Sequence, residues 1–523
     1  MKKAKGQETG PELTPGLRRY LYFTAGITGA AIMIVEILGA KMLAPYLGTS
    51  HFVWTAQIAV ALVALATGYY VGGRLADHSP RLGRLYAGIV VAGLYLAGTI
   101  LAIAPVAFGC LKFKLAVGSL LASMFLFFVP LSLLAMVGPF FVRVVTQSVT
   151  GVGGNVGRLT AVGTLGSFAG TLLIGYVLIP FLPNSYTLFL TSTGLFALAA
   201  VYFTVWGRKE GALAPVATAM VIGLAVGLVG VRASTRPEMR DGTELYRANS
   251  NFGMLQVVST SGSGYLYYLN DYLVQNTYDP IQKQSVSMFT YLLQDLAESY
   301  TPEIRSALCV GLGVGIVPMR FAEQGVAVDV VEINPAVVTV ARDYFDCRPE
   351  LFRQLELTDA RYFLNQTTNR YDTIILDAFL GDSSPVHLMT REAFESMHRL
   401  LQPNGTLVIN CFVEFRPARD FFGTSLNQTL RSVFRGVRVH SAGGGNVFFV
   451  ASDREDLRPL RTPDFDRVHP SVRRQAVAAY GGIVEPNLKR GMILTDDFNP
   501  VEARDASNRE EIRRHLAHGA RAL

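Results

Sequence analysis

Three glycines at alternate positions follow a short apolar run in the second half of the chain. The run is Ser306–Val310, and the glycines are Gly311, Gly313 and Gly315. A glycine-rich turn between a strand and a helix lets the backbone approach a ligand, and it points the amides of the helix N-terminus toward that ligand. Gly315 stands one position too early for the GxGxxG fingerprint of dinucleotide-binding proteins. The loop alone therefore indicates a bound nucleotide or nucleoside without identifying it.

Two acidic side chains near the ends of the next apolar runs could complete a nucleoside site. Glu332 lies 21 residues after Gly311, where an acidic side chain can accept hydrogen bonds from both ribose hydroxyls. Asp359 and Ala360 follow a third strand-like run, and this spacing can bring a carboxylate and a backbone amide to the edge of an adenine ring. Because three strand ends converge on one nucleoside, the combination is more specific than any single motif.

A further carboxylate follows the fourth apolar run, Tyr371–Leu376. Asp377 therefore stands at the carboxyl edge of the predicted sheet, where ligands of open α/β folds react. Either this side chain takes part in the chemistry or it caps the helix that follows. These residues do not distinguish a dinucleotide dehydrogenase from an enzyme that uses an adenosyl sulfonium compound.

The elements that must position these residues can be read from the apolar pattern. Short β-rich runs alternate with helical periodicity, which is typical of a parallel sheet with crossover helices. Two hairpin-like segments come first, at 254–259 and 265–274, and a helix around 285–299 follows. Further strands are expected at 406–411, 437–440 and 446–451. We therefore predict an α/β domain with a small β segment at its start.

The first half of the chain is far more apolar. Half of all residues are hydrophobic and 17% are charged, against roughly 25% charged in an ordinary soluble protein. Seven stretches are long enough to cross the hydrocarbon core of a membrane, which takes about 20 residues each. They are 20–43, 53–73, 84–108, 115–138, 156–181, 184–206 and 213–232. We therefore predict a multi-pass helical membrane bundle.

Three features of this bundle bear on function. Glu36 lies in the middle of the first stretch, where a carboxylate costs on the order of 3 kcal/mol unless it is paired or protonated. It serves either a polar substrate or proton site inside the bundle or an interhelical hydrogen bond. Small residues are dense in the fifth stretch, which suits close helix packing in lipid. The loop 72–77 resembles a loop motif of major-facilitator transporters.

Charge and cysteine usage exclude several kinds of site. The formal net charge is +7, and the basic residues are spread through tails and loops, so no nucleic-acid groove is indicated. The four cysteines lie far apart, with no CxxC pair and no histidine at metal-ligand spacing. Neither a disulfide framework nor a metal site is therefore expected.

Several segments of the second half resemble successive motifs of the spermidine synthase family. They are 269–275, 311–315, 331–334, 358–360 and 371–377. Two more, 377–390 and 494–502, are similar to the branch of that family that is fused to a membrane domain. The resemblance covers about residues 245–505. It implies a class I methyltransferase-like (Rossmann-like) fold.

The resemblance also implies a reaction. An aminopropyl group would pass from decarboxylated S-adenosylmethionine to an amine, with release of methylthioadenosine. A primary amine with a pKa near 10 is free base in only about one molecule per thousand at pH 7, so a carboxylate at the reacting nitrogen is needed to orient it and accept its proton. Asp377 matches the family's base. The nucleoside would be held by Gly311, Gly313, Glu332, Asp359 and Ala360.

Most of the nucleoside half of the family's site is retained in this chain, whereas the diamine half is altered. Val314 replaces a glycine-loop aspartate that holds the amine of the transferred chain. Leu380 replaces a second catalytic-loop aspartate, for which Asp382 could substitute. The family's nucleoside-binding glutamine and the tyrosine and acid of its gate segment fall on Gly253, Ser285 and Ser287. We therefore expect weak discrimination between S-adenosylmethionine and its decarboxylated form, or a preference for the former.

Other residues are candidates for contacts with the substrate. Asp496 and Asp497 would supply the missing negative charge if the C-terminal segment folds over the pocket, and otherwise they are solvated surface acids. Gln275 belongs to the first matching segment. His387 is either a substrate contact or a structural histidine at a helix end.

Two arguments about which side of the membrane carries the α/β domain point in opposite directions. The N-terminal tail and the loops after stretches two, four and six hold twelve Lys and Arg, whereas the opposite loops hold Lys112 and Lys114. The positive-inside rule then places the N-terminus in the cytoplasm, and seven spans would place the α/β domain outside. Because S-adenosylmethionine is made in the cytoplasm, we favour a cytoplasmic domain, with the stretch 213–232 lying against the bundle or re-entering.

We therefore predict a membrane-anchored aminopropyltransferase-like enzyme of polyamine biosynthesis. Its co-substrate would be decarboxylated S-adenosylmethionine or S-adenosylmethionine, without a metal. The partners would be a small amine or lipid-like acceptor and the lipid bilayer, with a homodimer as one arrangement and no nucleic acid. The predicted parts are a basic tail (1–19), a transmembrane domain (20–232), a linker (233–247), a small β/helix segment (248–300) and the nucleoside-binding domain (301–523).

Two alternatives remain open from the sequence. In the first, unmodified S-adenosylmethionine donates a methyl or aminocarboxypropyl group to a lipid or membrane-embedded acceptor. In the second, the protein is a transporter whose soluble domain senses adenosyl nucleosides. Retention of Asp377 favours an enzyme over a sensor, but it does not identify the acceptor.

Overall fold

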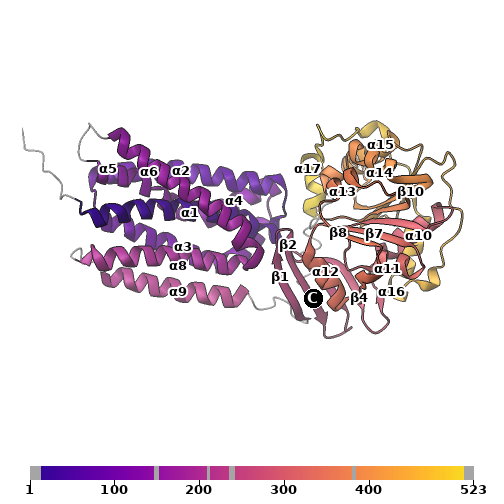
Figure 1. Cartoon of the computed structure of the whole chain (residues 1–523), viewed down its shortest axis with the longest axis horizontal. Helices are drawn as coiled ribbons and strands as arrows, with labels where there is room; N and C mark the ends of the chain where they lie inside the picture. Colours follow the sequence, from indigo (N-terminus) through magenta and orange to yellow (C-terminus); the bar gives the residue numbers. More distant parts are fainter. Residues whose placement is uncertain are drawn as a thin grey trace, which may run out of the picture. The chain divides into compact units, whose positions relative to one another are not determined.

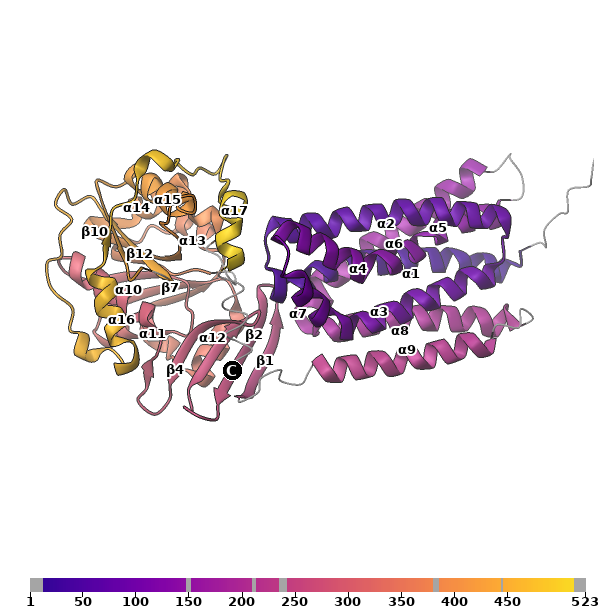
Figure 2. The ribbon, with the colours of Figure 1, turned by 180° about the vertical axis from the view of Figure 1, so that it is seen from behind.

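The computed structural model describes residues 13–146, 152–208, 213–234, 242–379, 385–443 and 445–511. The chain divides into two compact units, Met1–Arg236 and Pro237–Leu523. Figures 1 and 2 show that the first unit is helical and that the second combines helices with two sheets.

Long apolar helices make up the N-terminal unit. Seven segments in the described part are long and apolar enough to cross a membrane. They are Pro15–Leu47 (α1), His51–His78 (α2), Leu82–Cys110 (α3), Leu115–Val145, Val152–Phe181, Asn184–Val205 (α8) and Leu213–Ser234 (α9). The fourth divides into α4 (Leu115–Ala135) and α5 (Val137–Val145), and the fifth into α6 (Val152–Leu173), a π-helical turn (Ile174–Leu178) and α7 (Ile179–Phe181). The seven predicted stretches are confirmed as helices.

Glycines bring α1 and α6 into backbone contact. A Cβ atom at Gly166 would overlap the carbonyl oxygen of Gly26, and one at Gly170 would overlap the backbone of Ala30. Any larger residue at these two positions would push the helices apart. The small residues of the fifth predicted stretch therefore serve close helix packing, as expected for helices in lipid.

The last helix of this unit, α9, packs lengthwise against α3 and α8. Gly227 lies against Ala97, and one turn later Gly230 lies against Ile100. Positions advance together along both helices, so α9 and α3 run in the same direction. A continuous helix of 22 residues in this position differs from the re-entrant segment considered from the sequence.

Glu36 lies half-buried in α1. It has no hydrogen-bond or ionic partner among the described residues. The interhelical hydrogen bond considered for it is therefore not found in this part of the chain, and a role in a polar site inside the bundle stays a prediction.

The C-terminal unit begins with an antiparallel sheet whose five strands follow one another in sequence order. They are β1 (Gly242–Ser250), β2 (Gly253–Thr260), β3 (Leu266–Asn270), β4 (Leu273–Asp279) and β5 (Gln284–Ser285). A turn at Asp271 and Tyr272, with φ of 48° and 62°, divides the hairpin-like segment predicted at 265–274 into β3 and β4.

Strand β1 lies partly in the predicted linker, 233–247, which is therefore too long. Charged residues in β1 interrupt the apolar pattern by which a strand is recognised in a sequence. Glu244 and Arg247 pair with each other across 2.7 Å (Oε2 to Nη2), and only alternate side chains at the start of the strand are half-buried. An edge strand with paired charges does not show the apolar alternation that identifies strands.

The second sheet has eight strands in the order β13-β11-β12-β10-β9-β6-β7-β8. They are β6 (Ser306–Val310), β7 (Ala327–Glu332), β8 (Gln354–Leu357), β9 (Tyr371–Leu376), β10 (Leu401–Phe412), β11 (Gly436–Ser441), β12 (Asn446–Ser452) and β13 (Ile483–Val484). β8, β7, β6, β9 and β10 are parallel, whereas β12 pairs with β10 in the antiparallel sense. Counted from β6, the order 3-2-1-4-5-7-6 is that of the class I methyltransferase-like fold, which confirms the predicted fold class.

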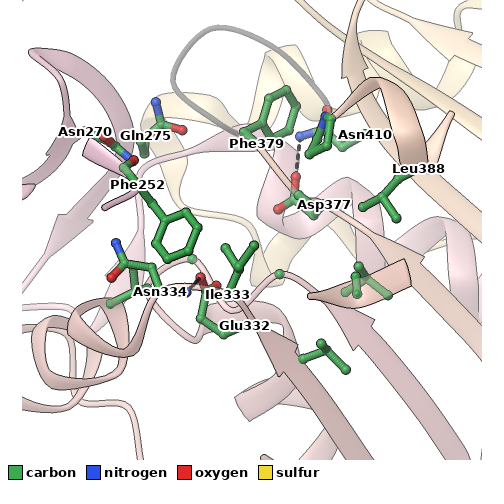
Figure 3. Close-up of a pocket in the computed structure, with 18 of the residues that line it drawn as sticks. Phe252, Asn270, Gln275, Glu332, Ile333, Asn334, Asp377, Phe379, Leu388 and Asn410 are labelled. Carbon is green, nitrogen blue, oxygen red and sulfur yellow. Dashed lines mark hydrogen bonds between the residues drawn. The ribbon is translucent and has the colours of Figure 1, made fainter. Parts of the chain in front are cut away.

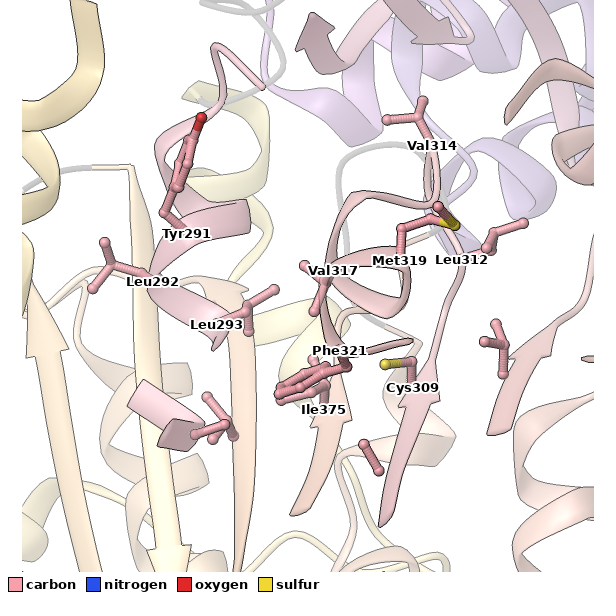
Figure 4. Close-up of a cluster of buried hydrophobic side chains, with 14 of the residues drawn as sticks. Tyr291, Leu292, Leu293, Cys309, Leu312, Val314, Val317, Met319, Phe321 and Ile375 are labelled. Atoms are coloured by element: carbon pink, nitrogen blue, oxygen red, sulfur yellow. The ribbon is translucent and has the colours of Figure 1, made fainter. Parts of the chain in front are cut away.

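The helices of this unit are α10 (Met288–Tyr300), α11 (Ile316–Glu323), α12 (Pro335–Tyr344), α13 (Ala360–Gln366), α14 (Arg391–Leu400), α15 (Phe421–Arg431), α16 (Pro470–Gly481) and α17 (Val501–Arg504). Most of them contact strands of the eight-stranded sheet. Figure 4 shows Leu292 and Leu293 of α10 and Phe321 of α11 packed with Cys309 of β6 and Ile375 of β9. Burying an aliphatic or aromatic side chain of this kind contributes about 1.5–3 kcal/mol. This core fixes β6 and β9 side by side beneath the glycine loop.

Candidate active site

The glycine loop follows β6, the strand at which the order of the sheet reverses between β7 and β9. Ligands of open α/β sheets bind outside the carboxyl ends of the strands at such a switch point. Gly311, Gly313 and Gly315 have φ of 99°, 54° and 85°, a region that favours glycine. A Cβ atom at Gly311 would also overlap the carbonyl oxygen of Asp377. The loop therefore requires glycine for its conformation and for the close approach of β6 and β9.

A pocket opens at the carboxyl ends of these strands, and both sheets contribute to its lining (Figure 3). Most of the residues predicted from the sequence lie in it. They are Gln275, Gly311, Gly313, Glu332, Asp359, Ala360, Asp377 and His387. Residues from strands far apart in the sequence thus meet around a single cavity.

Glu332 ends β7 with both carboxylate oxygens held by backbone amides. Oε2 accepts a hydrogen bond from the amide of Leu312 at 3.0 Å, and Oε1 accepts one from Asn334 at 2.8 Å. Burial raises the pKa of this carboxyl group, while the backbone amides act in the opposite direction. Each carboxylate oxygen can accept a second hydrogen bond. Glu332 is therefore held in an orientation that leaves acceptor capacity for two ribose hydroxyls beside the glycine loop.

Asp359 divides its two oxygens between a helix and the pocket. Oδ1 accepts hydrogen bonds from the backbone amides of Arg361 at 2.8 Å and Tyr362 at 3.2 Å, so it caps α13. Oδ2 lies 3.3 Å from Nε2 of His387. The capping contact fixes the position of Ala360, the first residue of the helix. His387 consequently lies beside Asp359, one of the two residues predicted to contact the edge of the adenine ring.

Asp377 follows β9 and ends a chain of side-chain hydrogen bonds. Nδ2 of Asn410 donates to Oδ1 of Asp377 at 2.8 Å, and Nδ2 of Asn446 donates to Oδ1 of Asn410 at 2.9 Å. Burial raises the pKa of Asp377 to about 6, although the hydrogen bond from Asn410 lowers it. A group that is mostly ionised at neutral pH and still binds a proton readily suits a general base.

The alternative role of Asp377, as a helix cap, is not found. The next helical element in the described part is the short 3-10 turn Val386–Leu388, and the side chain of Asp377 bonds to Asn410 instead.

Comparison with known proteins agrees with this geometry. The family model described as the spermine/spermidine synthase domain matches residues 288–435. The C-terminal unit contains a spermine/spermidine synthase domain. A polyamine aminopropyltransferase from Vibrio vulnificus is 38% identical over 130 residues, which are 24% of this chain and 44% of the relative. An N-terminal histidine N-methyltransferase from Emericella nidulans is 32% identical over 166 residues, 31% of this chain and 26% of the relative.

The chain thus spans less than half of the length of these two curated relatives. Among solved structures, the spermidine synthase from Thermotoga maritima is similar with a TM-score of 0.38 and 18% identity, covering 47% of this chain and 86% of that chain.

Two other predicted residues, Asp496 and Asp497, do not line the pocket of the synthase domain. Asp382 lies outside the described residues. Asp497 is exposed and away from the lining. Asp496 accepts hydrogen bonds from Nη2 of Arg361 at 2.5 Å and from Oγ1 of Thr390 at 2.6 Å. Because its carboxylate is occupied by these structural partners, the expectation that Asp496 brings charge to the substrate is not supported.

Asp496 belongs to a segment, residues 494–499, that fastens one wall of the pocket. The carbonyl oxygen of Leu494 accepts a hydrogen bond from the amide of Arg391 at 2.8 Å, and Nδ2 of Asn499 donates to the carbonyl oxygen of Val386 at 3.0 Å. The wall of the pocket that these two hydrogen bonds hold in place includes His387. This segment therefore acts on the site by holding its wall in place.

Several residues of the synthase domain are placed differently from the expectation based on the family. Val314 is 2% exposed, lies in the hydrophobic cluster of Figure 4 and is not among the pocket residues. The expectation that position 314 contacts the donor chain is therefore not supported. Ser287 accepts a hydrogen bond from the amide of Thr277 at 2.9 Å, and Ser285 accepts one from the amide of Ser287 at 3.1 Å. Both serines serve the local fold.

The sequence did not single out the amides and aromatic rings of the pocket. Asn410 and Asn446 approach Asp377 from neighbouring strands, and Phe252, Phe379 and Phe412 also line the cavity. One signal was present, because Asn410 interrupts an otherwise apolar run near the carboxyl end of the predicted strand 406–411.

Proposed function

We propose that the synthase domain is an aminopropyltransferase, anchored in a lipid bilayer by the N-terminal helices. It would join the aminopropyl group of decarboxylated S-adenosylmethionine to an amine and release methylthioadenosine. The observation that supports this best is the position of Asp377, a carboxylate with a pKa of about 6 in the same pocket as the glycine loop and Glu332. Glu332 would bind the ribose, and Asp359 with Ala360 would bind the adenine.

The chemistry assigned to these residues is a displacement at carbon. The nitrogen of the acceptor forms a bond to the carbon beside the sulfonium, the carbon–sulfur bond breaks, and its electron pair stays on sulfur. The proton lost by the nitrogen passes to Asp377. Because Asn410 occupies Oδ1 of Asp377, Oδ2 remains to orient the amine and accept this proton.

The experiment uses the purified full-length protein in detergent. Binding of decarboxylated and of unmodified S-adenosylmethionine is measured by calorimetry, and methylthioadenosine release is followed with a panel of amines. We expect amine-dependent release and less than about a tenfold difference in binding between the two donors. The described lining has neither lysine nor arginine to bind the carboxylate of the unmodified donor, and its acids do not include position 314. Absence of methylthioadenosine with every amine would refute the proposed reaction.

A second candidate is transfer of a methyl group from S-adenosylmethionine. One relative, 32% identical over 166 residues, is named as a histidine N-methyltransferase, and the fold accommodates both reactions. The products separate the two candidates, since methyl transfer releases S-adenosylhomocysteine and aminopropyl transfer releases methylthioadenosine.

A further inference from the structure

Amides and aromatic rings surround the carboxylate of Asp377. The rings of Phe379 and Phe412 lie with centroids 5.3 Å apart, and both line the pocket. Figure 3 shows Phe379 and Asn410 on the same side of the cavity as Asp377. Asn410 donates a hydrogen bond to Asp377 and accepts one from Asn446, so the amide of Asn410 has partners within the protein.

The other acids of the pocket are engaged elsewhere. Among the described lining residues the acids are Glu332, Asp359 and Asp377. Glu332 is bound by two backbone amides beside the glycine loop, and Asp359 caps α13 and faces His387. In the described part of the pocket, Asp377 is therefore the one acid on the side formed by β9, β10 and β12.

We infer that the acceptor presents a single basic nitrogen to Asp377 and an uncharged, flat or apolar body to Phe379 and Phe412. This inference rests on the proposed function and specifies the class of its acceptor. A diamine would bury its second ammonium group without an acidic partner among the described residues, and an unpaired buried charge is strongly disfavoured. An aromatic or aliphatic body instead displaces water from the two rings and stacks on them.

The test compares three amines as acceptors for the full-length protein, at equal concentrations of free base: n-butylamine, 1,4-diaminobutane and 2-phenylethylamine. We expect kcat/KM for 2-phenylethylamine to exceed that for n-butylamine by about two- to tenfold, the range given by an aromatic pair. The second amino group of 1,4-diaminobutane should lower kcat/KM by at least about tenfold relative to n-butylamine, because its ammonium group has no acidic partner among the described lining residues.

Two variants test whether the aromatic rings of the pocket cause the preference for 2-phenylethylamine. Phe412→Ala should reduce kcat/KM for 2-phenylethylamine about fivefold more than it reduces kcat/KM for n-butylamine, since the aromatic acceptor loses a stacking partner. Leu460→Ala is the control, because Leu460 is an apolar residue that is 50% exposed and lies outside both the pocket lining and the segment 494–499. It should change neither value.

Several results would overturn the inference. A kcat/KM for 1,4-diaminobutane equal to or above that for n-butylamine would show that a second acid holds the far ammonium group, and loss of that activity in Asp382→Asn would identify the acid. If no amine supports turnover, the proposed function fails, and the same ranking is then measured by calorimetry on protein saturated with methylthioadenosine. The expected order there supports the inference, whereas preference for the diamine or no binding of any amine refutes it.

Discussion

Strand β9 carries an aspartate at each end, and replacing each with asparagine separates catalysis from folding. Asp377 follows the strand at the pocket. Asp372 stands at the opposite end, where its Oδ2 accepts hydrogen bonds from the amides of Arg305 and Ser306, each at 2.9 Å. The amide of Asp377→Asn can still accept the hydrogen bond from Asn410. We therefore expect Asp377→Asn to lose turnover and keep its stability, and Asp372→Asn to do the reverse.

The expected loss of turnover in Asp377→Asn depends on the pKa of Asp377 and on the pKa of the acceptor amine. With a pKa of about 6, Asp377 is ionised in about nine-tenths of molecules at pH 7, whereas an amine with a pKa near 10 is free in about one per thousand. A positioned base contributes about 10²–10⁴ to the rate. We expect kcat to fall by at least about 10², or about 2.7 kcal/mol, while affinity for methylthioadenosine stays within a few-fold.

The direction in which Asp377→Asn should change the stability of the protein can be worked out from the pKa of Asp377. The pKa of Asp377 is raised in the folded protein from an ordinary value near 3.9, so the fold disfavours the ionised form. The contribution of Asp377 to stability is present below about pH 4 and is lost as the pH rises through 6. At pH 7, Asp377→Asn should consequently melt at the same temperature as the unmodified protein or above it, and this difference should shrink between pH 6 and 4.

The assays are methylthioadenosine release between pH 5 and 9 and thermal unfolding in detergent. In the unmodified protein, kcat/KM should fall below about pH 6 as Asp377 takes up a proton, and this limb should be missing from the residual activity of Asp377→Asn. Asp372→Asn should lower the free energy of unfolding by about 1–2 kcal/mol through its charged hydrogen bonds. Full turnover in Asp377→Asn would make the residue structural, and a large fall in its melting temperature would show that the charge supports the fold.

The other predictions concern the nucleoside, the C-terminal segment and the membrane. Glu332→Ala should weaken methylthioadenosine binding by more than about tenfold, because charge-assisted hydrogen bonds of about 1.5–3 kcal/mol are removed; equal affinity in calorimetry would exclude it from the site. Asp359→Ala should do the same and also lower the melting temperature through loss of a cap worth about 1 kcal/mol, whereas Asp359→Asn should retain the melting temperature. Asp496→Ala should cost about 0.5–1 kcal/mol of stability without a change in KM; a raised KM at constant stability would return it to substrate binding. Because α9 runs in the same direction as α3, a cysteine at Thr243 and one in the N-terminal tail should react with an impermeant reagent from opposite sides, and the positive-inside rule places Thr243 outside. The experiment uses a Cys110→Ser background, since Cys110 is the partly exposed cysteine, and labelling of both sites from one side would show that α9 does not cross.

That predicted topology is the alternative to the cytoplasmic domain favoured from the sequence, and the difference between the two predictions depends on α9. The sequence argument needed the stretch 213–232 to remain on one side of the membrane, and its content of Ala and Gly allowed this. The glycines of α9 are instead contact points, since Gly227 and Gly230 let Ala97 and Ile100 of α3 approach. Composition alone does not distinguish glycines that loosen a helix from glycines that pack it.

Much of the fold could be predicted, and so could the meeting of Gly311, Glu332, Asp359 and Asp377 in one pocket, because both depend on local patterns. Apolar periodicity reports burial, and in a parallel sheet burial gives continuous apolar runs, as at β6 and β9. Residues that follow such runs, including Glu332 and Asp377, must meet at the carboxyl edge of the sheet. The positions of these residues therefore follow from the directions of the strands, which can be inferred from the sequence.

The remaining parts depend on contacts that no local pattern reports. Asp271 and Tyr272 form the tight turn of the predicted hairpin-like segment 265–274 without the glycine that usually marks such a turn, so the position of the turn could not be predicted. The hydrogen bond between Asn410 and Asp377 joins residues 33 positions apart, and that between Arg361 and Asp496 joins residues 135 apart. The choice between a substrate acid and a structural acid at position 496 was therefore open until its partners were known.

The segment 494–499 has a consequence for how the protein is made. Synthesis proceeds from the N-terminus at about 5–20 residues per second, and domains fold as their parts emerge. The last strand of the synthase domain ends at Val484, so both sheets can form while the residues after it are still inside the ribosome. The wall that carries His387 is fastened only when Leu494 and Asn499 have emerged and found Arg391 and Val386. A nascent chain can therefore hold a folded sheet and still lack a finished substrate site, which delays activity until synthesis of the domain is complete.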